Sequence, residues 1–428
     1  MLLSIDNFKS IEHVVKVDIS DLTVLAGVNS SGKSSLIQAL LLLKQTLTSS
    51  SSELLNLNGP YVYANSLTDL MHNKRGGEMK FALAISEDEL KETDIQNYAP
   101  KGSFVKTFII SISFSVRANG PFQISEFFLK LEFDNQETLN LILKKRPQRR
   151  IYDLTVDDSQ FKDITLDSYS FVNFFPVFFN YDNKTSDLPV VKAARETLIS
   201  ILNRVVYIAP LRVAPVLART YQTNVETRFV EPGGENTRFI LDKLATEDKY
   251  NFDLVKEWIC NKFHLAKDLN IVKESGKRYR VVVTTNEDIK VDLMHMGFGL
   301  SQILPIITQG CILRPTSLLI VEDPDVHMHP SIQASMADFF IFLCLERKVS
   351  ILIETHSDHF VTRLRRRIAE KIITPDKVHL IFVEKEYGES DYQTISLSPQ
   401  GRLEGSMPAG FMDSMDNDFR AILEANRK

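Results

Sequence analysis

Apolar and polar residues alternate at the start of the chain and then give way to a continuous apolar run. Residues 2–8 and 14–19 alternate, which is typical of half-buried strands, and we expect them to form a hairpin. Residues 22–26 form a short apolar run that ends at a glycine, and this predicts a buried strand. Residues 34–47 are rich in Leu, Ile, Gln and Ala, a composition that favours a helix.

The middle of the chain first loses this pattern and then acquires a strand pattern. A break rich in Thr and Ser at 48–52 precedes a polar stretch that we expect to be irregular to about residue 100. Residues 104–116 and 122–133 are enriched in β-branched and aromatic residues, and strands are expected as far as residue 156. We interpret residues 51–205 as an inserted lobe that is mostly antiparallel.

The rest of the chain comes to alternate between helix and strand patterns. The further expected elements are helices at 187–204, 236–248 and 252–264, strands at 269–273, 279–284 and 288–292, helix 300–309, strand 317–322, helix 331–345, strand 349–354, helix 357–372 and strand 378–384. This alternation predicts an α/β fold. We expect the strand at 22–26 to join the same mixed sheet, so that residues 1–50 and 206–428 form one domain.

The composition is that of an ordinary globular protein with a slight excess of acid. The 428 residues are 44% hydrophobic and carry a formal net charge of −5, which argues against nucleic acid coating the entire surface. Three cysteines far apart predict neither a disulfide framework nor a zinc site. The N-terminus lacks a signal pattern and the most apolar stretch, 171–181, is too short for a membrane span, so we expect a cytoplasmic protein without membrane contact.

Residues 27–34 match the phosphate-binding pattern G-x-x-x-x-G-K-[ST] without exception. Glycines let such a loop curl so that its backbone N–H groups point at phosphate oxygens, and the following helix adds its positive end. Lys33 would reach the β- and γ-phosphates, and the Ser34 hydroxyl would ligate Mg²⁺. A glycine–serine turn that matches by chance is the alternative, but the strand before and the helix after the loop argue against it. The predicted ATP-binding residues of the loop are Asn29, Ser30, Ser31, Gly32, Lys33, Ser34 and Ser35.

An apolar strand later in the chain ends in two adjacent carboxylates, Glu322 and Asp323. In a phosphate-loop protein, a carboxylate at such a position holds Mg²⁺ and a second one polarises the attacking water. We therefore predict Glu322 as a metal ligand together with Ser34, and Asp323 as the general base. The alternative is that Glu322 and Asp323 are merely solvated acids where a strand meets a turn. The presence of a phosphate loop in the same chain argues against this alternative.

Histidines follow the ends of two predicted strands. His327 and His329 could form a metal pair, but neither a cysteine nor a third obvious ligand lies near them in sequence. His356 follows the strand at 349–354 and could lie near a γ-phosphate, while Ser357 could cap the next helix. These two interpretations of residues 356 and 357 are compatible.

Taken jointly, these motifs resemble the ABC-type ATPase heads of the SMC/RecF/OLD superfamily. The pattern is most similar to stand-alone AAA-type ATPases of prokaryotic antiphage defence operons, such as the Septu ATPase subunit. Residues 5–11 (IDNFKSI), 322–330 (EDPDVHMHP) and 354–357 (ETHS) are similar to the family's N-terminal, Walker B and switch-histidine motifs. Residues 297–302 (GFGLSQ) lie where the family carries its signature, and 408–413 (PAGFMD) is similar to its C-terminal ending.

The resemblance implies a P-loop ABC-type head that forms a head-to-tail dimer or a higher oligomer around ATP. Gly299 and Ser301 would contact the γ-phosphate from the partner subunit, and the catalytic set would be Glu322, Asp323 and His356. The family usually has glutamate where this chain has Asp323, and residues 58–72 offer no match to its glutamine loop. We therefore expect ATP binding with hydrolysis that is slow or depends on a partner.

Three functions are consistent with these features. The first is an antiphage ATPase that restrains a separate nuclease of HNH or Toprim type, because the segment after residue 356 is too short for a Toprim domain of its own. The second is a RecF-like DNA-maintenance ATPase. In that case the basic clusters at 144–150 and 363–367 could bind DNA or RNA. The alternatives for these clusters are an ordinary solvated face or an interface with acidic residues. The third is a scaffold that needs ATP only as a structural ligand.

Overall fold

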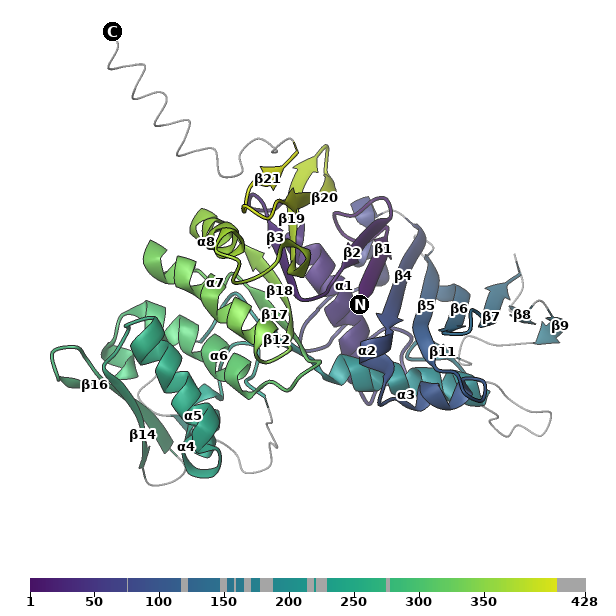
Figure 1. Ribbon diagram of the computed structural model, residues 1–428. Helices are drawn as coiled ribbons and strands as arrows, with labels where there is room; N and C mark the ends of the chain where they lie inside the picture. The colour runs from purple at the N-terminus through teal and green to yellow at the C-terminus, as the bar shows by residue number, and fades with distance from the viewer. Residues whose placement is uncertain are drawn as a thin grey trace, which may run out of the picture. The chain divides into compact units, whose positions relative to one another are not determined.

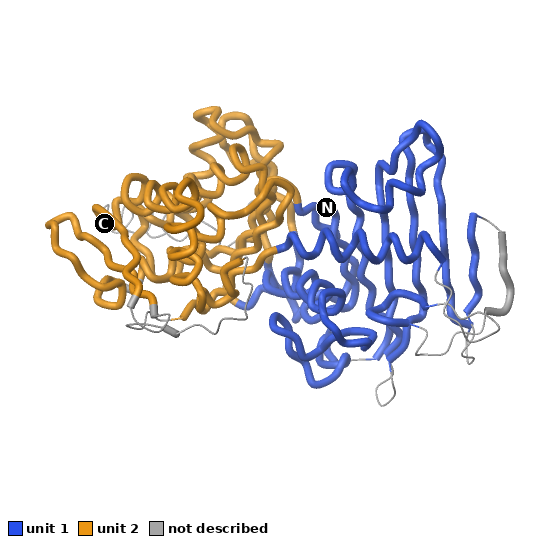
Figure 2. Tube along the Cα trace, turned by 90° about the horizontal axis from the view of Figure 1, so that it is seen from below, with its two compact units in different colours: residues 1–19, 30–205, 384–392 blue, residues 20–29, 206–383, 393–428 orange. Residues whose placement is uncertain are grey.

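The structure is a computed structural model that describes residues 1–74, 76–116, 122–146, 152–157, 159–164, 171–177, 188–213, 219–220, 229–274 and 278–405. Two compact units divide the chain, and Figure 2 shows them in different colours. Unit 1 contains residues 1–19, 30–205 and 384–392, and unit 2 contains residues 20–29, 206–383 and 393–428. Each unit is described by itself. The motif at 408–413 lies outside the described residues.

Unit 1 is built on an antiparallel sheet of eight strands in the order β2-β1-β4-β5-β6-β7-β8-β9 (Figure 1). The predicted pairing of residues 2–8 with 14–19 is confirmed, and β1 also pairs with β4 on its other side. The strands are β1 (Leu2–Asp6), β2 (Val15–Asp18), β4 (Gly77–Ser86), β5 (Val105–Val116), β6 (Gln123–Phe133), β7 (Thr138–Lys145), β8 (Tyr152–Val156) and β9 (Ser159–Ile164).

Strand β4 corrects the prediction that the chain is irregular up to about residue 100. Met79, Phe81, Leu83 and Ile85 are all buried, while the residues between them are partly exposed. This period of two is the pattern of a strand with one buried face. The glycines and polar residues around the segment hid the pattern in the sequence.

The helices of unit 1 are α1 (Lys33–Thr48), α2 (Glu87–Leu90) and α3 (Pro189–Asn203), and the predictions at 34–47 and 187–204 are confirmed. α1 packs against α3 and β1. Its side chains are buried on nearly every side, which explains why its apolar pattern is almost continuous. Lys44 of α1 is buried and donates a hydrogen bond of 2.7 Å to the carbonyl of Leu202.

Unit 2 is organised by a sheet of seven strands in the order β12-β17-β18-β3-β19-β20-β21. Strand β3 lies between β18 and β19 and is parallel to both, so the prediction that residues 22–26 share a sheet with the C-terminal α/β run is confirmed. The strands are β3 (Leu22–Ala26), β12 (Val205–Ile208), β17 (Leu318–Glu322), β18 (Ser350–Thr355), β19 (Val378–Glu386), β20 (Glu389–Leu397) and β21 (Leu403–Glu404). The ends of β19 and β20 that face their connecting turn belong to unit 1.

Helices cover this sheet, and a second, smaller sheet accompanies them. The helix α7 packs on β18 and β3 and lies beside α8, as Figure 1 shows. α4 packs on the small sheet formed by β13 to β16. The predicted helices and strands of this part are confirmed as α4 (Thr237–Glu247), α5 (Lys249–Lys256) with a π-helical turn at Glu257–Lys262, α6 (Phe298–Ile312), α7 (Pro330–Leu345), α8 (Asp358–Ala369), β14 (Asp268–Glu274), β15 (Arg278–Thr284) and β16 (Lys290–Asp292), and β13 is Arg219–Thr220.

The three parallel strands β17, β18 and β3 end at one edge of the unit 2 sheet. Glu322 is in register with Glu354, and Thr355 is in register with Ala26. Residues 27–29, which begin the phosphate loop, therefore start from the same edge as the acidic strand end. Among the described residues, no helix is both long enough and apolar enough to cross a membrane.

Candidate functional site

The first glycine of the phosphate loop is required by its surroundings in unit 2. Gly27 has a φ of 148°, and a Cβ at this position would overlap the backbone carbonyl of Val383 on β19. An L-residue would be strained both by this φ and by the contact. The loop therefore leaves β3 by a path that only glycine allows.

The second glycine, Gly32, lies where α1 begins in unit 1. Its φ is 107°, and a Cβ here would overlap the hydroxyls of Ser10 and Ser390. No side chain caps the N-terminus of α1, and its first turn contains no acidic residue. Backbone N–H groups at such a helix end form a ready site for a phosphate, because they carry the positive end of the helix dipole.

Side chains from β20 and from the segment after β1 hold the loop in unit 1. The Tyr392 hydroxyl donates to the Gly32 carbonyl at 2.7 Å, and the Ser390 hydroxyl donates to the Ser31 carbonyl. The hydroxyls of Ser10 and Ser35 share a hydrogen bond of 2.9 Å. The carbonyls of Ser31 and Gly32 are thus fixed by hydroxyl groups from outside the loop.

Two side chains of the loop fit a phosphate-binding role. Ser31 Oγ is buried and has no hydrogen-bond partner among the described residues. A buried hydroxyl of this kind is usually hydrogen-bonded to a ligand or a water molecule. Ser30 adopts a φ of 60°, so the loop is curled at this residue. Lys33 is the first residue of α1 and is 2% exposed, as is expected of a lysine held inside such a loop.

The acidic strand end places Asp323 in an uncommon backbone conformation. Asp323 has a φ of 46°, and its N–H donates to the carbonyl of Glu354 on the neighbouring strand at 2.9 Å. Its Oδ1 atom is buried without a hydrogen-bond partner in the described chain. The Nε2 atom of His356 lies 3.8 Å from this oxygen. The predicted base and the predicted switch histidine are therefore brought together.

Residues at this edge could hold a divalent cation. Asp323, Glu354 and His356 each offer one ligand atom, and these atoms lie within 4.8 Å of one another. The predicted ligand Glu322 is buried beside them in sequence and accepts a hydrogen bond of 2.8 Å from Tyr207. Since Mg²⁺ prefers carboxylate and water oxygens, the unpartnered Asp323 Oδ1 and the neighbouring glutamates fit this ion.

The pair His327 and His329 belongs to neither of the two groups of possible metal ligands found among the described residues. His329 instead caps α7, where its Nδ1 accepts a hydrogen bond from the Ser331 N–H at 3.3 Å. Ser357 caps α8 in the same way through the N–H of Phe360, as predicted.

Arg212 and Tyr207 complete the group, although the sequence analysis did not identify them. Arg212 donates from one Nη atom to the carbonyls of Glu322 at 2.6 Å and Asp323 at 3.0 Å. Burial lowers the pKa of the Arg212 guanidinium to about 10, although the negative charges of Asp323 and Asp325 act to raise it. The strand pattern of residues 205–208, followed by a proline and an arginine, was the signal that could have pointed to them.

Asp325 is a further buried acid of the group that the sequence analysis did not single out. It accepts a hydrogen bond of 2.9 Å from the Thr355 hydroxyl. Burial raises the pKa of Asp325 to about 6, because the hydrogen bond from Thr355 does not offset the loss of hydration and the neighbouring Asp323 adds repulsion. Burial and the negative charge of Glu322 likewise raise the pKa of Tyr207.

The predicted signature residues begin α6. Gly299 is partly exposed, and a Cβ on it would lie 3.3 Å from the His327 carbonyl. Ser301 is buried, and Gln302 donates to the Arg212 carbonyl at 3.4 Å. This helix start is therefore attached within unit 2 to the loop that carries Arg212.

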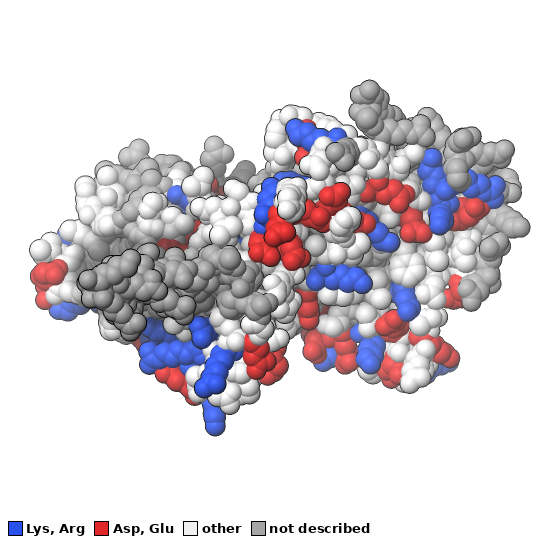
Figure 3. Space-filling view, turned by 90° about the horizontal axis from the view of Figure 1, so that it is seen from above, with Lys and Arg blue, Asp and Glu red and all other residues white. Residues whose placement is uncertain are grey.

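All four arginines of the basic helix α8 have partners inside the protein. Arg363 and Arg367 pair with Asp338 of α7, Arg366 and Arg367 pair with Glu370, and Arg365 donates to the Gly401 carbonyl. This favours the acidic interface over nucleic-acid binding for residues 363–367. Of the other basic cluster, Arg146 pairs with Asp153, and residues 147–150 lie outside the described residues. On the face seen in Figure 3, basic and acidic side chains are interspersed over the described surface.

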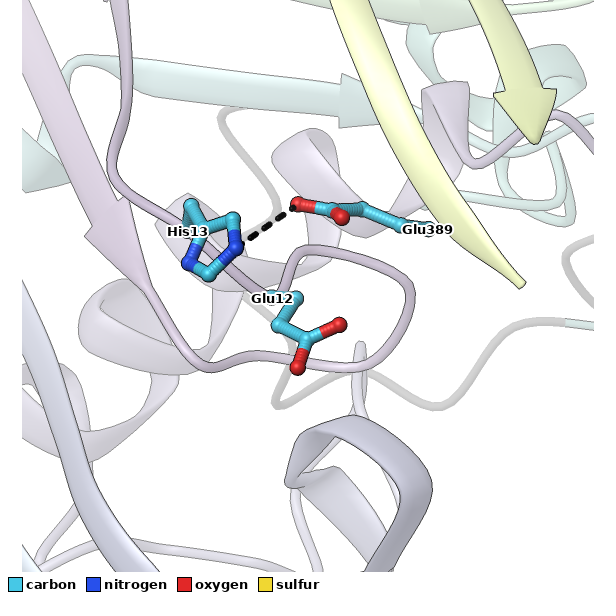
Figure 4. Close-up of side chains that lie close together, drawn as sticks. All are labelled: Glu12, His13 and Glu389. Atoms are coloured by element: carbon cyan, nitrogen blue, oxygen red, sulfur yellow. Dashed lines mark ion pairs between the residues drawn. The ribbon is translucent and has the colours of Figure 1, made fainter. Parts of the chain in front are cut away.

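A second group of possible metal ligands lies in unit 1 (Figure 4). His13 Nε2 is 4.0 Å from Glu389 Oε1, and Glu12 is 3.3 Å from the Nε2 atom of His72. His13 is 82% exposed, so its imidazole is well hydrated. Paired and solvated in this way, the group needs no ligand.

The sequence profile of a family described as the AAA ATPase domain matches residues 1–198 and 229–361, well over half of the chain. No curated protein matches the chain. Three solved structures resemble the chain at TM-scores below 0.5.

These three structures are SMC head domains. An Smc head bound to the C-terminal winged-helix domain of ScpA has a TM-score of 0.49 and 13% identity, covering 92% of this chain and 98% of that chain. An Smc head with an extended coiled coil bound to the C-terminal domain of ScpA, derived from Pyrococcus furiosus, has a TM-score of 0.46 and 10% identity, covering 100% and 99%. The SMC head domain from Thermotoga maritima has a TM-score of 0.41 and 9% identity, covering 92% and 98%.

Proposed function

Because the chain belongs to the AAA ATPase domain family, we propose that it binds Mg²⁺-ATP on residues 27–35 and hydrolyses it slowly, with Asp323 as the general base. The observation that carries this proposal is the Asp323 carboxylate. Its Oδ1 is buried without a hydrogen-bond partner among the described residues, and it follows a strand that ends at the same sheet edge as β3. A carboxylate oxygen without a donor from the described chain can accept a hydrogen bond from a water molecule, as a general base must do.

Each group of the proposed site would have its own role in ATP hydrolysis. The N–H groups at the start of α1 and the Lys33 ammonium would hold the phosphates, and Asp323 would take the proton of the attacking water. His356, whose Nε2 lies 3.8 Å from Asp323 Oδ1, would stabilise that carboxylate when its imidazole is protonated. Ser34 and Glu322 would hold Mg²⁺, which neutralises charge on the phosphates. Asp323 is one methylene shorter than a glutamate, and this supports slow turnover.

Nucleotide titration tests the binding half of this proposal. In the presence of Mg²⁺, the chain should bind a fluorescent ATP analogue, and Lys33→Ala should weaken binding by at least about tenfold because it removes a charge-assisted contact. Asp323→Asn should bind as tightly as the unsubstituted protein, since Asp323 acts on water. Equal affinity of the Lys33→Ala variant and the unsubstituted protein would contradict the assignment of the loop.

The proposal extends to a head-to-tail dimer that closes around ATP, as in the antiphage ATPases that the motifs resemble. Gly299 and Ser301 lie at the start of α6, where N–H groups could contact a γ-phosphate of the partner subunit. Light scattering of the Asp323→Asn variant should show a dimer with ATP and a monomer without it. Ser301→Arg should prevent the dimer and leave ATP binding intact. A dimer that forms equally without ATP would contradict this mode of assembly.

The function that the dimer would serve is control of a separate nuclease in antiphage defence. The motif resemblance to Septu-type ATPases supports this part of the proposal, and the arginine pairs of α8 favour it over direct clamping of DNA. Affinity purification from the native host should recover a nuclease that dissociates when the nucleotide state changes. Recovery of DNA in place of a protein partner would support the RecF-like alternative.

A further inference from the structure

Arg212 is a buried cation attached to the acidic strand end of unit 2. The residue is 5% exposed, and one Nη atom donates to the carbonyls of both Glu322 and Asp323, at 2.6 and 3.0 Å. Its Nε and other Nη atoms are buried and have no hydrogen-bond partner among the described residues. A buried guanidinium with unpaired N–H groups destabilises the folded protein unless surrounding charges or a ligand stabilise it. We therefore asked what Arg212 contributes to the site.

The backbone that Arg212 holds is strained. Asp323 is a non-glycine residue with a φ of 46°, in the left-handed region that few non-glycine residues adopt. Such conformations persist only where neighbouring groups fix them. Two contacts do so here, namely the Arg212 bridge to the carbonyls on either side of the strained residue and the Asp323 N–H donated to Glu354.

The strained conformation decides where the Asp323 carboxylate points. In it, Asp323 Oδ1 is buried and keeps no hydrogen bond to the described residues, while His356 approaches it to 3.8 Å. If residue 323 relaxed toward an ordinary extended or helical φ, the carboxylate would turn to another direction. The contacts of Arg212 therefore bear on the geometry of the base without touching its oxygens.

An arginine suits this task better than a lysine would. One Nη atom makes both contacts, and its two N–H groups are held in the plane of the guanidinium, whereas an ammonium is a flexible point charge. Arg212 also lies close enough to Glu322, Asp323 and Asp325 for their charges to act on it. It thus offsets part of the repulsion between these acids.

We propose that Arg212 is a positioning residue for ATP hydrolysis, which fixes the left-handed backbone of Asp323 and thereby aims its carboxylate at the attacking water. This rests on the proposed hydrolytic function. The Gln302 hydrogen bond to the Arg212 carbonyl attaches the start of α6 to the same residue.

Steady-state kinetics of Arg212→Lys and Arg212→Ala test this role. Because a misplacement of about 1 Å can cost a hundredfold in rate, Arg212→Lys should lower kcat by about 10- to 100-fold while the KM for ATP changes less than about threefold. Arg212→Ala should be slower still, and millimolar guanidinium should restore part of its kcat by filling the space left. Arg366→Lys is the matched control, because Arg366 is exposed and pairs only along its own helix; it should keep the full rate.

The outcomes separate this inference from the proposed function. An Arg212→Lys variant with the kcat of the unsubstituted protein would overturn the positioning role while leaving hydrolysis intact. Loss of ATP binding and of thermal stability in both variants, without rescue by guanidinium, would show a purely structural residue and would also overturn it. Absence of phosphate release by the unsubstituted protein would reject hydrolysis itself and this role with it.

Discussion

At the scale of single residues, the site combines a strained acid with side chains that hold its backbone. Asp323 is fixed from two sides, by Arg212 and by the carbonyl of Glu354, and its Oδ1 faces no donor in the described chain. Asp325 shares the region and is held by Thr355. The carboxylate proposed as the base is therefore the one with an oxygen, Oδ1, that has no hydrogen-bond partner in the described chain.

The length of the Asp323 side chain gives a first prediction. If the short carboxylate limits turnover, Asp323→Glu should raise kcat severalfold, because the longer side chain approaches the water more closely. Phosphate release at saturating Mg²⁺-ATP measures this. Asp376→Glu, at an exposed position, serves as the control and should change nothing. A lower kcat in Asp323→Glu would show that side-chain length is not the limit.

The conformation of Gly32 gives a second prediction, with Gly102→Ala as its matched control. Both glycines have a positive φ, but a Cβ on Gly102 would meet nothing within 4 Å, whereas one on Gly32 would overlap Ser10 and Ser390. Gly102→Ala should lower stability by about 1–2 kcal/mol through the backbone alone. Gly32→Ala should lower it more and weaken ATP binding, as measured by thermal unfolding and nucleotide titration. Equal effects of the two substitutions would contradict the steric account of the loop.

A functional residue could be predicted from the sequence only where its partners lie close to it in the sequence. The phosphate loop and the pair Glu322–Asp323 could be recognised because the motif and the strand end lie within a few consecutive residues. Arg212 and Tyr207 could not, since their contacts with the acidic strand end join residues 110 or more positions apart. The strain at Asp323 likewise follows from its contact with the neighbouring strand.

At the scale of elements, strong periodic patterns were predictable and strand partners were not. The helices and strands of the last third lie where the patterns predicted them, because the buried parallel strands are continuous apolar runs. β4 was missed although its alternation is regular, because polar residues and glycines surround it. The pairing of β1 with β4 joins residues 74 to 82 positions apart, and no local pattern encodes such a contact.

Helix α1 gives a prediction on the pH dependence of stability. Burial lowers the pKa of Lys44 from 10.5 to about 8, so between these values the unfolded chain keeps a proton that the folded chain has lost. Stability contributed by this site therefore rises with pH over that range. The free energy of unfolding relative to a Lys44→Met variant should shift by up to about 3 kcal/mol in favour of the unsubstituted protein.

Urea unfolding of both proteins at intervals from pH 7 to pH 10.5 would measure this shift. Lys101→Met, which replaces an exposed lysine, is the matched control. A constant difference for Lys44→Met would mean that Lys44 is hydrated in the folded state.

At the scale of the whole molecule, the chain interleaves its two units in sequence. Residues 20–29 of unit 2 carry β3 and the start of the phosphate loop, and residues 30–34 of unit 1 carry the rest of it. The loop is thus the covalent junction between an antiparallel sheet and a mainly parallel one.

The measurement that tests this account most directly is phosphate release by the purified protein with Mg²⁺-ATP, beside Lys33→Ala and Asp323→Asn. We expect slow turnover that exceeds the Lys33→Ala background, and a rate lowered at least about 100-fold in Asp323→Asn, in line with the loss of a general base. Asp323→Asn should still bind ATP. A rate for the unsubstituted protein no higher than that of Lys33→Ala, or full activity of Asp323→Asn, would contradict the assignment of Asp323 as the base of a working ATPase.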